Sequence, residues 1–322
     1  MRVIGTLLLA VLIGAVFLVG LYFLSPEYFV KIVVAGERAS AGLERHETDV
    51  DGFHIAYLDS KGTGEPLLLV HGFASDKDSW NRVARTLSKH FRIIAVDMPG
   101  FGESSAKPGA TYTIPEQTER LHAFVGSIGL TRVHIGGFSM GGFIAADYAI
   151  RYPNEVGSVW LIDSAGVWTA PQSELQKRLE TNQGNPLLMS SVDDFREMAK
   201  FMMSKPPYFP DRALAVLAQR EIDAQALRVQ QFKDVNSSPK LEGRIDGLPI
   251  PLHIVWGKKD RALDVGAVDI LKKLVPGATA TVMPGIGHVP ILEDPDGTAA
   301  DYLRFRQGVE ATMPVTRTDP PA

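Results

Sequence analysis

The residues with the clearest chemical potential form a G-x-S-x-G pentapeptide, Gly137–Gly141, with Ser139 at its centre. The pentapeptide follows a largely apolar run at 133–136 and precedes a run of small and apolar residues at 143–149. This order predicts a strand, a sharp turn and a helix, the context that lifts a nucleophilic serine hydroxyl out of a sheet. The glycines leave room for the strained backbone of such a turn. The alternative is a glycine-rich turn in which Ser139 only caps the helix.

A nucleophilic serine needs a base, and the eight histidines of the chain differ in their expected positions. His288 lies in a glycine-rich loop at 285–290, after the last expected strand, where the backbone can direct an imidazole sideways. The other histidines fall in expected helices, inside strands, or at early strands that precede the catalytic edge. His71, directly before Gly72, is expected to be structural. We therefore predict His288 as the base.

The acid that orients the base should precede it, because sites built on this turn follow the chain order Ser, then Asp or Glu, then His. Asp260 follows the apolar strand at 252–256 and is the predicted acid. Asp264 and Asp163 are the alternatives. Asp264 comes one helical turn later, and Asp163 follows a different strand.

Two backbone N–H groups are expected to face the oxygen that becomes negative during attack. One belongs to Met140, which directly follows the serine at the start of its helix. The second is predicted at Phe73, because His71 and Gly72 form a glycine turn after an early strand. The alternative for this segment is a tight turn without a chemical role.

Composition limits the classes of protein that fit. The chain has 322 residues, 45% of them hydrophobic, which is enough for one large core with an inserted lid. The net charge is −4 and the charges are dispersed, so no nucleic-acid partner is expected. Cysteine is absent, which excludes disulfides and thiolate metal sites. No metal site is predicted.

The N-terminus carries an uncharged apolar run from Val3 to Leu24. Its length is sufficient to cross the roughly 30 Å hydrocarbon core of a bilayer as a helix. Residues 1–24 are therefore predicted to be a retained single-pass membrane anchor, most simply in a bacterial inner membrane. A cleaved signal peptide and a buried core helix are the alternatives. Basic residues on both flanks leave the orientation open, and residues 25–45 are expected to form a juxtamembrane linker.

Strand and helix patterns alternate from about His46, which predicts an α/β fold. The expected core comprises residues 46–163 and 249–310. The tail at 311–322 is rich in proline, lacks apolar periodicity and is expected to be disordered.

The segment 164–248 interrupts the alternation, and it contains helical patterns rich in Met, Phe and Pro. A loop of that length without structure is improbable in a compact domain, so an inserted helical cap is predicted. Most of its Met and aromatic residues are expected to form the core of the cap, while others line an acyl pocket. The candidate substrate contacts, in the cap or beside the serine and the base, are Phe138, Phe201, Met202, Tyr208 and Val289.

Taken together, these stretches resemble the α/β-hydrolase superfamily, as do the segments Asp97–Ser104 and Trp256–Asp260. The narrower resemblance is to bacterial lipases of the Moraxella and Psychrobacter type and to membrane-anchored monoacylglycerol lipases. It rests on Trp160–Gly166, Asn185–Leu188 and Lys205–Pro210. The resemblance implies an eight-stranded, mostly parallel sheet and cofactor-free hydrolysis of acylglycerol esters. It also implies the roles given above for Ser139, Asp260, His288, Phe73 and Met140.

Other functions fit parts of the same pattern. A general short-chain carboxylesterase or a carbon–carbon bond hydrolase would keep the serine, acid and base. A catalytically silent ligand-binding protein at the membrane is the alternative from a different class. Dehalogenases and epoxide hydrolases of this fold use an aspartate nucleophile, so Ser139 argues against them. The expected partners are a lipid or ester substrate and, through the N-terminal helix, a membrane.

Overall fold

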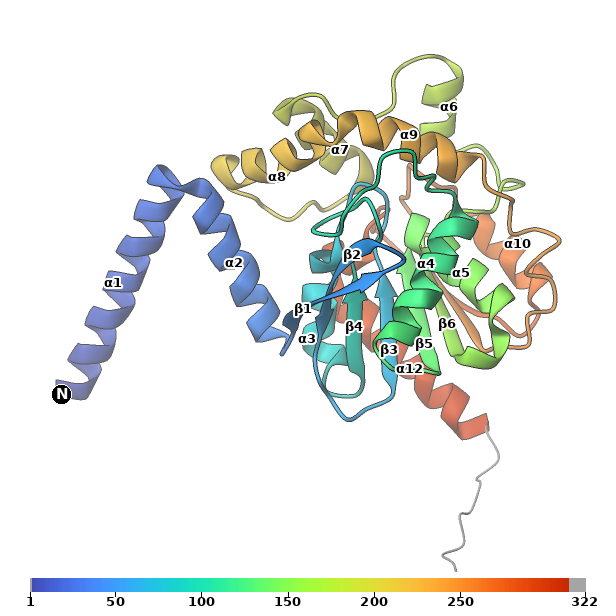
Figure 1. The fold of residues 1–322 in the computed structure, drawn as a ribbon, viewed down its shortest axis with the longest axis horizontal. Coiled ribbons are helices and arrows are strands. Elements are labelled where there is room, and N and C mark those ends of the chain that lie inside the picture. Colours follow the sequence, from blue (N-terminus) through green and yellow to red (C-terminus); the bar gives the residue numbers. More distant parts are fainter. Residues whose placement is uncertain (1, 313–322) are drawn as a thin grey trace, which may run out of the picture.

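An eight-stranded sheet forms the centre of the molecule, in the order β1-β2-β4-β3-β5-β6-β7-β8 (Figure 1). A computed structural model describes residues 2–312, and for residues 2–5 and 7–11 it describes the backbone alone. The strands β1 and β2 pair antiparallel, as do β2 and β4, and the remaining neighbours pair in parallel. The strands are β1 (Glu44–Val50), β2 (Phe53–Asp59), β3 (Pro66–Val70), β4 (Arg92–Val96), β5 (Val133–Phe138), β6 (Val156–Ile162), β7 (Leu252–Gly257) and β8 (Thr279–Met283). The predicted α/β fold with a mostly parallel eight-stranded sheet is confirmed.

Helices cover both faces of the sheet because its central strands are apolar on both sides. In β3, Leu68 and Val70 face one core cluster, and Leu67 and Leu69 face the other. Helices α4 (Ile114–Ser127), α5 (Met140–Arg151) and α10 (Ala267–Leu274) pack on the first face. The second face is covered by α3 (Asn81–Leu87) and α12 (Pro295–Thr312). Short helices complete the core at η1 (Lys77–Trp80), η2 (Pro153–Glu155) and α11 (Pro290–Glu293).

The chain between β6 and β7 forms helices α6 (Glu174–Glu180), α7 (Val192–Met202), α8 (Asp211–Asp223) and α9 (Gln225–Asn236). No strand occurs in this segment, which lies entirely within the described residues. The helices lie together over one end of the sheet (Figure 1). This end carries the carboxyl termini of the parallel strands, where side chains from several strands converge.

The N-terminal helix α1 (Arg2–Leu24) projects away from the domain and turns sharply into α2 (Pro26–Ser40) (Figure 1). Among the residues whose side chains are described, no helix is both long and apolar enough to cross a membrane. The predicted anchor therefore stays a prediction.

Residues 25–45, expected as a linker, form α2 and the start of β1, and α2 is attached to the core. Arg38 donates two hydrogen bonds of 2.6 Å to the carboxylate of Asp78. Arg82 contacts Glu37 at 3.2 Å. The boundary expected at residue 46 falls inside β1, a polar strand without alternating apolar residues. Of the expected disordered tail, residues 311–312 end α12, and residues 313–322 lie outside the described part of the chain.

Candidate active site

Ser139 occupies the strained turn between β5 and α5. Its φ of 55° and ψ of −122° place it outside the regions that side-chain-bearing residues favour. Its N–H donates to the carbonyl of Ile162 at 2.9 Å, and its own carbonyl accepts from Gly142 at 3.0 Å. A Cβ at Gly137 would collide with the backbone of Gly141, so the turn can close only with glycine there. The result is a half-buried serine at the amino end of a helix.

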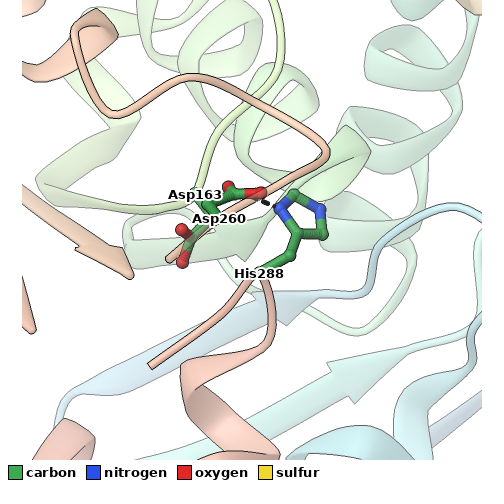
Figure 2. A group of neighbouring side chains, drawn as sticks. All are labelled: Asp163, Asp260 and His288. Carbon is green, nitrogen blue, oxygen red and sulfur yellow. Dashed lines mark hydrogen bonds and ion pairs between the residues drawn. The ribbon is translucent and has the colours of Figure 1, made fainter. Parts of the chain in front are cut away.

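Asp260 and His288 meet at the ends of neighbouring strands. The Nδ1 atom of His288 lies 2.7 Å from Oδ2 of Asp260, and both side chains are almost fully buried (Figure 2). The other oxygen of Asp260 accepts the N–H groups of Ala262 at 2.8 Å and Leu263 at 3.0 Å. These three contacts fix the carboxylate and select the tautomer of His288 that carries its proton on Nδ1.

The alternative acids occupy different positions. Asp264 accepts a hydrogen bond from the N–H of Gly266 at 2.8 Å, one turn beyond Asp260. Asp163 is fully buried beside Asp260, and its Oδ1 accepts from the N–H of Gly257 at 2.9 Å. Burial, followed by the charge of Asp260, raises the pKa of Asp163 well above its usual range. Of the three carboxyls, the one that bonds to His288 is Asp260.

The second ring nitrogen of His288, Nε2, is the one that does not face Asp260. It is buried and has no hydrogen-bond partner among the described residues. His288 and Ser139 line the same cavity, together with Phe73 and Met140. Neither Phe73 nor Met140 uses its backbone N–H for a hydrogen bond within the described part of the chain. Ser139, His288, Phe73 and Met140 therefore border one space.

The side chain of His71 connects the loop that carries Phe73 to the loop after β4. One ring nitrogen, Nδ1, lies 2.7 Å from the carbonyl of Gly72, and Nε2 accepts the N–H of Met98 at 3.0 Å. Burial lowers the pKa of His71 to about 4, so the ring is neutral near physiological pH. With Nδ1 as donor and Nε2 as acceptor, both nitrogens are occupied. This arrangement agrees with a structural role for His71.

The cavity is narrow and mostly apolar, with a volume of about 90 Å³. Met202 lines it, and its role as a substrate contact stays a prediction. Phe138 packs in the core against Trp80, Val289 is buried at the start of α11, and Tyr208 is 87% exposed. Phe201 lies between two guanidinium groups, 4.7 Å from that of Arg178 and 4.5 Å from that of Arg261.

Most of the cavity wall consists of residues that were not expected as contacts. Most are apolar: Ala165, Trp168, Leu175, Leu179, Leu187, Phe232, Val235, Ala262 and Leu263, while Gln176 and Asn236 are polar. Two of these contacts could have been predicted from the sequence. Leu175 and Leu179 are four residues apart, and this spacing places both on one face of α6.

Asp163, Asp260 and His288 also form a group whose ligand atoms lie within 4.8 Å of one another. Carboxylate and imidazole groups can bind a metal ion. Here, however, Asp260 already accepts three N–H donors, and one oxygen of Asp163 accepts another. These hydrogen bonds are the ones expected of a carboxylate paired with an imidazole, not of a set of metal ligands. The expectation of no metal site remains a prediction.

The strand order, the serine turn after β5 and the Asp–His pair define a class of enzymes that carry a serine on a strand-to-helix elbow. Comparison with known proteins gives the family. The family described as "alpha/beta hydrolase fold" matches residues 65–295, and the chain belongs to this family.

Three relatives illustrate the similarity. Lipase 1 of Psychrobacter immobilis is 40% identical over 87% of this chain and 89% of its own length. The human monoacylglycerol lipase ABHD6 is 27% identical over 90% of each chain. A crystal structure of a bacterial membrane phospholipase A is 37% identical, covers 96% of this chain and 99% of its own, and superposes with a TM-score of 0.87. The resemblance to bacterial lipases and monoacylglycerol lipases is confirmed.

Proposed function

We propose that this protein is a serine carboxylic-ester hydrolase and, more specifically, a lipase that cleaves acylglycerols. The observation that carries the proposal is the shared apolar cavity lined by Ser139, His288, Phe73 and Met140. Among the described residues, Nε2 of His288 has no hydrogen-bond partner there. The names of the relatives, two lipases and a phospholipase, support an ester of a fatty acid as the substrate.

The chemistry proceeds in two halves. Nε2 of His288 takes the proton of the Ser139 hydroxyl as its oxygen attacks the ester carbonyl. The N–H groups of Phe73 and Met140 stabilise the negative oxygen of the tetrahedral intermediate. The intermediate collapses, His288 returns the proton to the leaving alcohol, and an acyl-serine remains. Water then repeats the sequence and releases the fatty acid.

Asp260 supports both halves without exchanging a proton. Its hydrogen bond to Nδ1 keeps Nε2 as the free acceptor and stabilises the imidazolium that forms during each attack. Because Asp260 is buried, little water screens this interaction.

The membrane anchor is the second part of the proposal. From Leu12 to Leu24, most large apolar side chains of α1 are more than half exposed, an arrangement that favours lipid over water. Arg212, at the start of cap helix α8, donates a 2.9 Å hydrogen bond to the carbonyl of Phe23 near the end of α1. The cap would then lie at the bilayer surface, where lipid substrates are concentrated. Removal of residues 1–24 should reduce hydrolysis of bilayer-embedded lipid more than hydrolysis of a soluble ester.

A short-chain carboxylesterase is the second candidate, and the small volume of the cavity favours it. About 90 Å³ accommodates a short acyl group, whereas a long chain requires the cap side chains to separate.

A panel of substrates tests both candidates. Purified full-length protein in detergent micelles is assayed with mono-, di- and triacylglycerols, a phospholipid, and nitrophenyl esters of increasing chain length. The Ser139→Ala variant is the matched control. Ser139-dependent release of fatty acid from acylglycerols supports the lipase. Activity confined to short nitrophenyl esters supports the carboxylesterase, and ester hydrolysis that survives Ser139→Ala contradicts both.

A further inference from the structure

Asp163 is a second buried carboxyl beside the Asp260–His288 pair, and the chemistry described above does not use it. It follows β6, the strand next to β7, and its side chain is fully buried. Its φ of 41° is strained for a residue that carries a side chain. Ligand atoms of Asp163, Asp260 and His288 lie within 4.8 Å of one another (Figure 2). Strained backbone of this kind often accompanies a functional constraint.

The two carboxyls differ in the hydrogen bonds they receive. Asp260 accepts three, from Nδ1 of His288 and from the backbone N–H groups of residues 262 and 263. Asp163 accepts one, from the N–H of Gly257. Its Oδ2 is buried and accepts no hydrogen bond from the described residues, so this oxygen is available to carry a proton. Since donors stabilise the ionised form of a carboxyl, the negative charge belongs on Asp260.

Two carboxylates this close in a buried site cannot both be ionised at low cost. Burial and the charge of Asp260 raise the pKa of Asp163, and the carboxylate of Glu293 in α11 acts in the same direction. His288 is a further titratable group that faces the pair, and its Nδ1 bonds to Asp260. Within the described residues, no ion pair connects a cationic side chain to Asp163.

We propose that Asp163 is a positioning residue that stays protonated, accepts the N–H of Gly257 with Oδ1 and donates its own O–H to Asp260. The pair then carries a single negative charge, located on the carboxylate that faces His288. This inference rests on the proposed roles of Asp260 and His288. The shared proton remains with the pair throughout the reaction, and no bond to substrate is formed.

The Asp163→Asn variant tests the protonation state because an amide is a neutral isostere of the protonated acid. Its oxygen can accept from Gly257, and its N–H can donate to Asp260. Catalytic efficiency, kcat/KM, should stay within about threefold of the unmodified protein, and the midpoint of the acid limb of its pH profile should not move. Asp163→Ala removes the donor and should lower kcat by about tenfold or more.

A different pH profile would overturn the proposal. If Asp163 were ionised, Asp163→Asn would remove a negative charge near His288, and the acid limb would shift by about one pH unit or more to lower pH. The matched control is Asp264→Asn, which changes a carboxyl in the same loop that does not contact the pair. It should leave the acid limb in place.

A direct measurement does not depend on the reaction. In protein labelled with ¹³C at aspartate carboxyls, the signal that disappears in Asp163→Asn, or in Asp163→Ala, belongs to Asp163. The proposal predicts a protonated carboxyl shift at about pH 7, whereas an ionised shift overturns it. Absence of Ser139-dependent hydrolysis would contradict the proposed function, while the carboxyl signal would still decide the state of Asp163.

Discussion

The backbone N–H of His288 donates a 2.7 Å hydrogen bond to the carbonyl oxygen of Met202, which joins the loop of the proposed base directly to the cap. Glu293 strengthens this junction. Its carboxylate accepts the N–H groups of Ser204 and Lys205 on the cap side and of Gly287 on the loop side. A change in the position of the cap therefore changes the position of the imidazole.

Glu293→Ala tests this coupling. The substitution removes the acceptor of two partly buried N–H groups, those of Gly287 and Val289, and of two exposed ones, those of Ser204 and Lys205. The free energy of unfolding should fall by about 2–4 kcal/mol. Displacement of the His288 loop should also reduce kcat/KM by about 10- to 100-fold. Thermal unfolding and ester hydrolysis provide the two measurements. Glu197→Ala, on the exposed face of α7, is the control and should change neither. A lower Tm with unchanged kcat would show that the cap and the imidazole are independent.

Asp260→Asn should separate catalysis from folding. The amide has nearly the same volume as the carboxylate but favours the wrong tautomer of His288 and does not stabilise the imidazolium. We expect kcat to fall by about 10³- to 10⁴-fold, while the circular dichroism spectrum stays unchanged. Asp264→Asn should retain most of the activity. Near-normal turnover in Asp260→Asn would transfer the role of the acid to another carboxyl.

Met202→Trp should alter the preference for acyl-chain length. Met202 lines the narrow cavity, and an indole there would occupy space that a longer chain needs. The kcat/KM ratio of a nitrophenyl octanoate to an acetate should fall by about tenfold or more. Tyr208→Ala, at an exposed position, should leave the ratio unchanged. Equal losses on both esters would indicate that chains extend in another direction.

The buried His134 should contribute a loss of stability as the pH falls from 6.5 to about 4. Burial lowers the pKa of His134 from 6.5 to about 4. In this window the unfolded chain binds protons that the folded protein excludes, so acid favours unfolding. The Tm measured across the window should decline less steeply for His134→Gln than for the unmodified protein. His90→Gln, on the surface, should not alter the slope. Equal slopes for His134→Gln and the unmodified protein would contradict this cause.

The positions of the candidate site residues could be predicted from the sequence where a residue follows an apolar strand. Ser139, Asp260 and His288 each come directly after a strand or in the loop behind one, and parallel strands end at the same edge. It was therefore predictable that these three side chains lie at the same edge of the sheet. The relation of Asp163 to Asp260 was not, because it depends on β6 and β7 being neighbours in the sheet.

Features that depend on packing between distant segments were also not predictable. Strand β1 is mostly polar because it lies at the edge of the sheet, so its sequence lacks the alternation that identifies a strand. Helix α2 was expected as a linker because its attachment depends on Arg38 reaching Asp78, forty residues later. The cavity wall joins Leu175 of α6 to Phe232 of α9, which lie in different cap helices.

The mass of the covalent intermediate tests most directly whether Ser139 is the nucleophile. The protein is incubated with a fluorophosphonate or a slowly hydrolysed ester, and the intact mass and the peptide masses are measured. We expect a single added group on the peptide that contains Ser139, and no addition to the folded Ser139→Ala variant. A label on another residue, or labelling that persists in Ser139→Ala, would contradict Ser139 as the nucleophile.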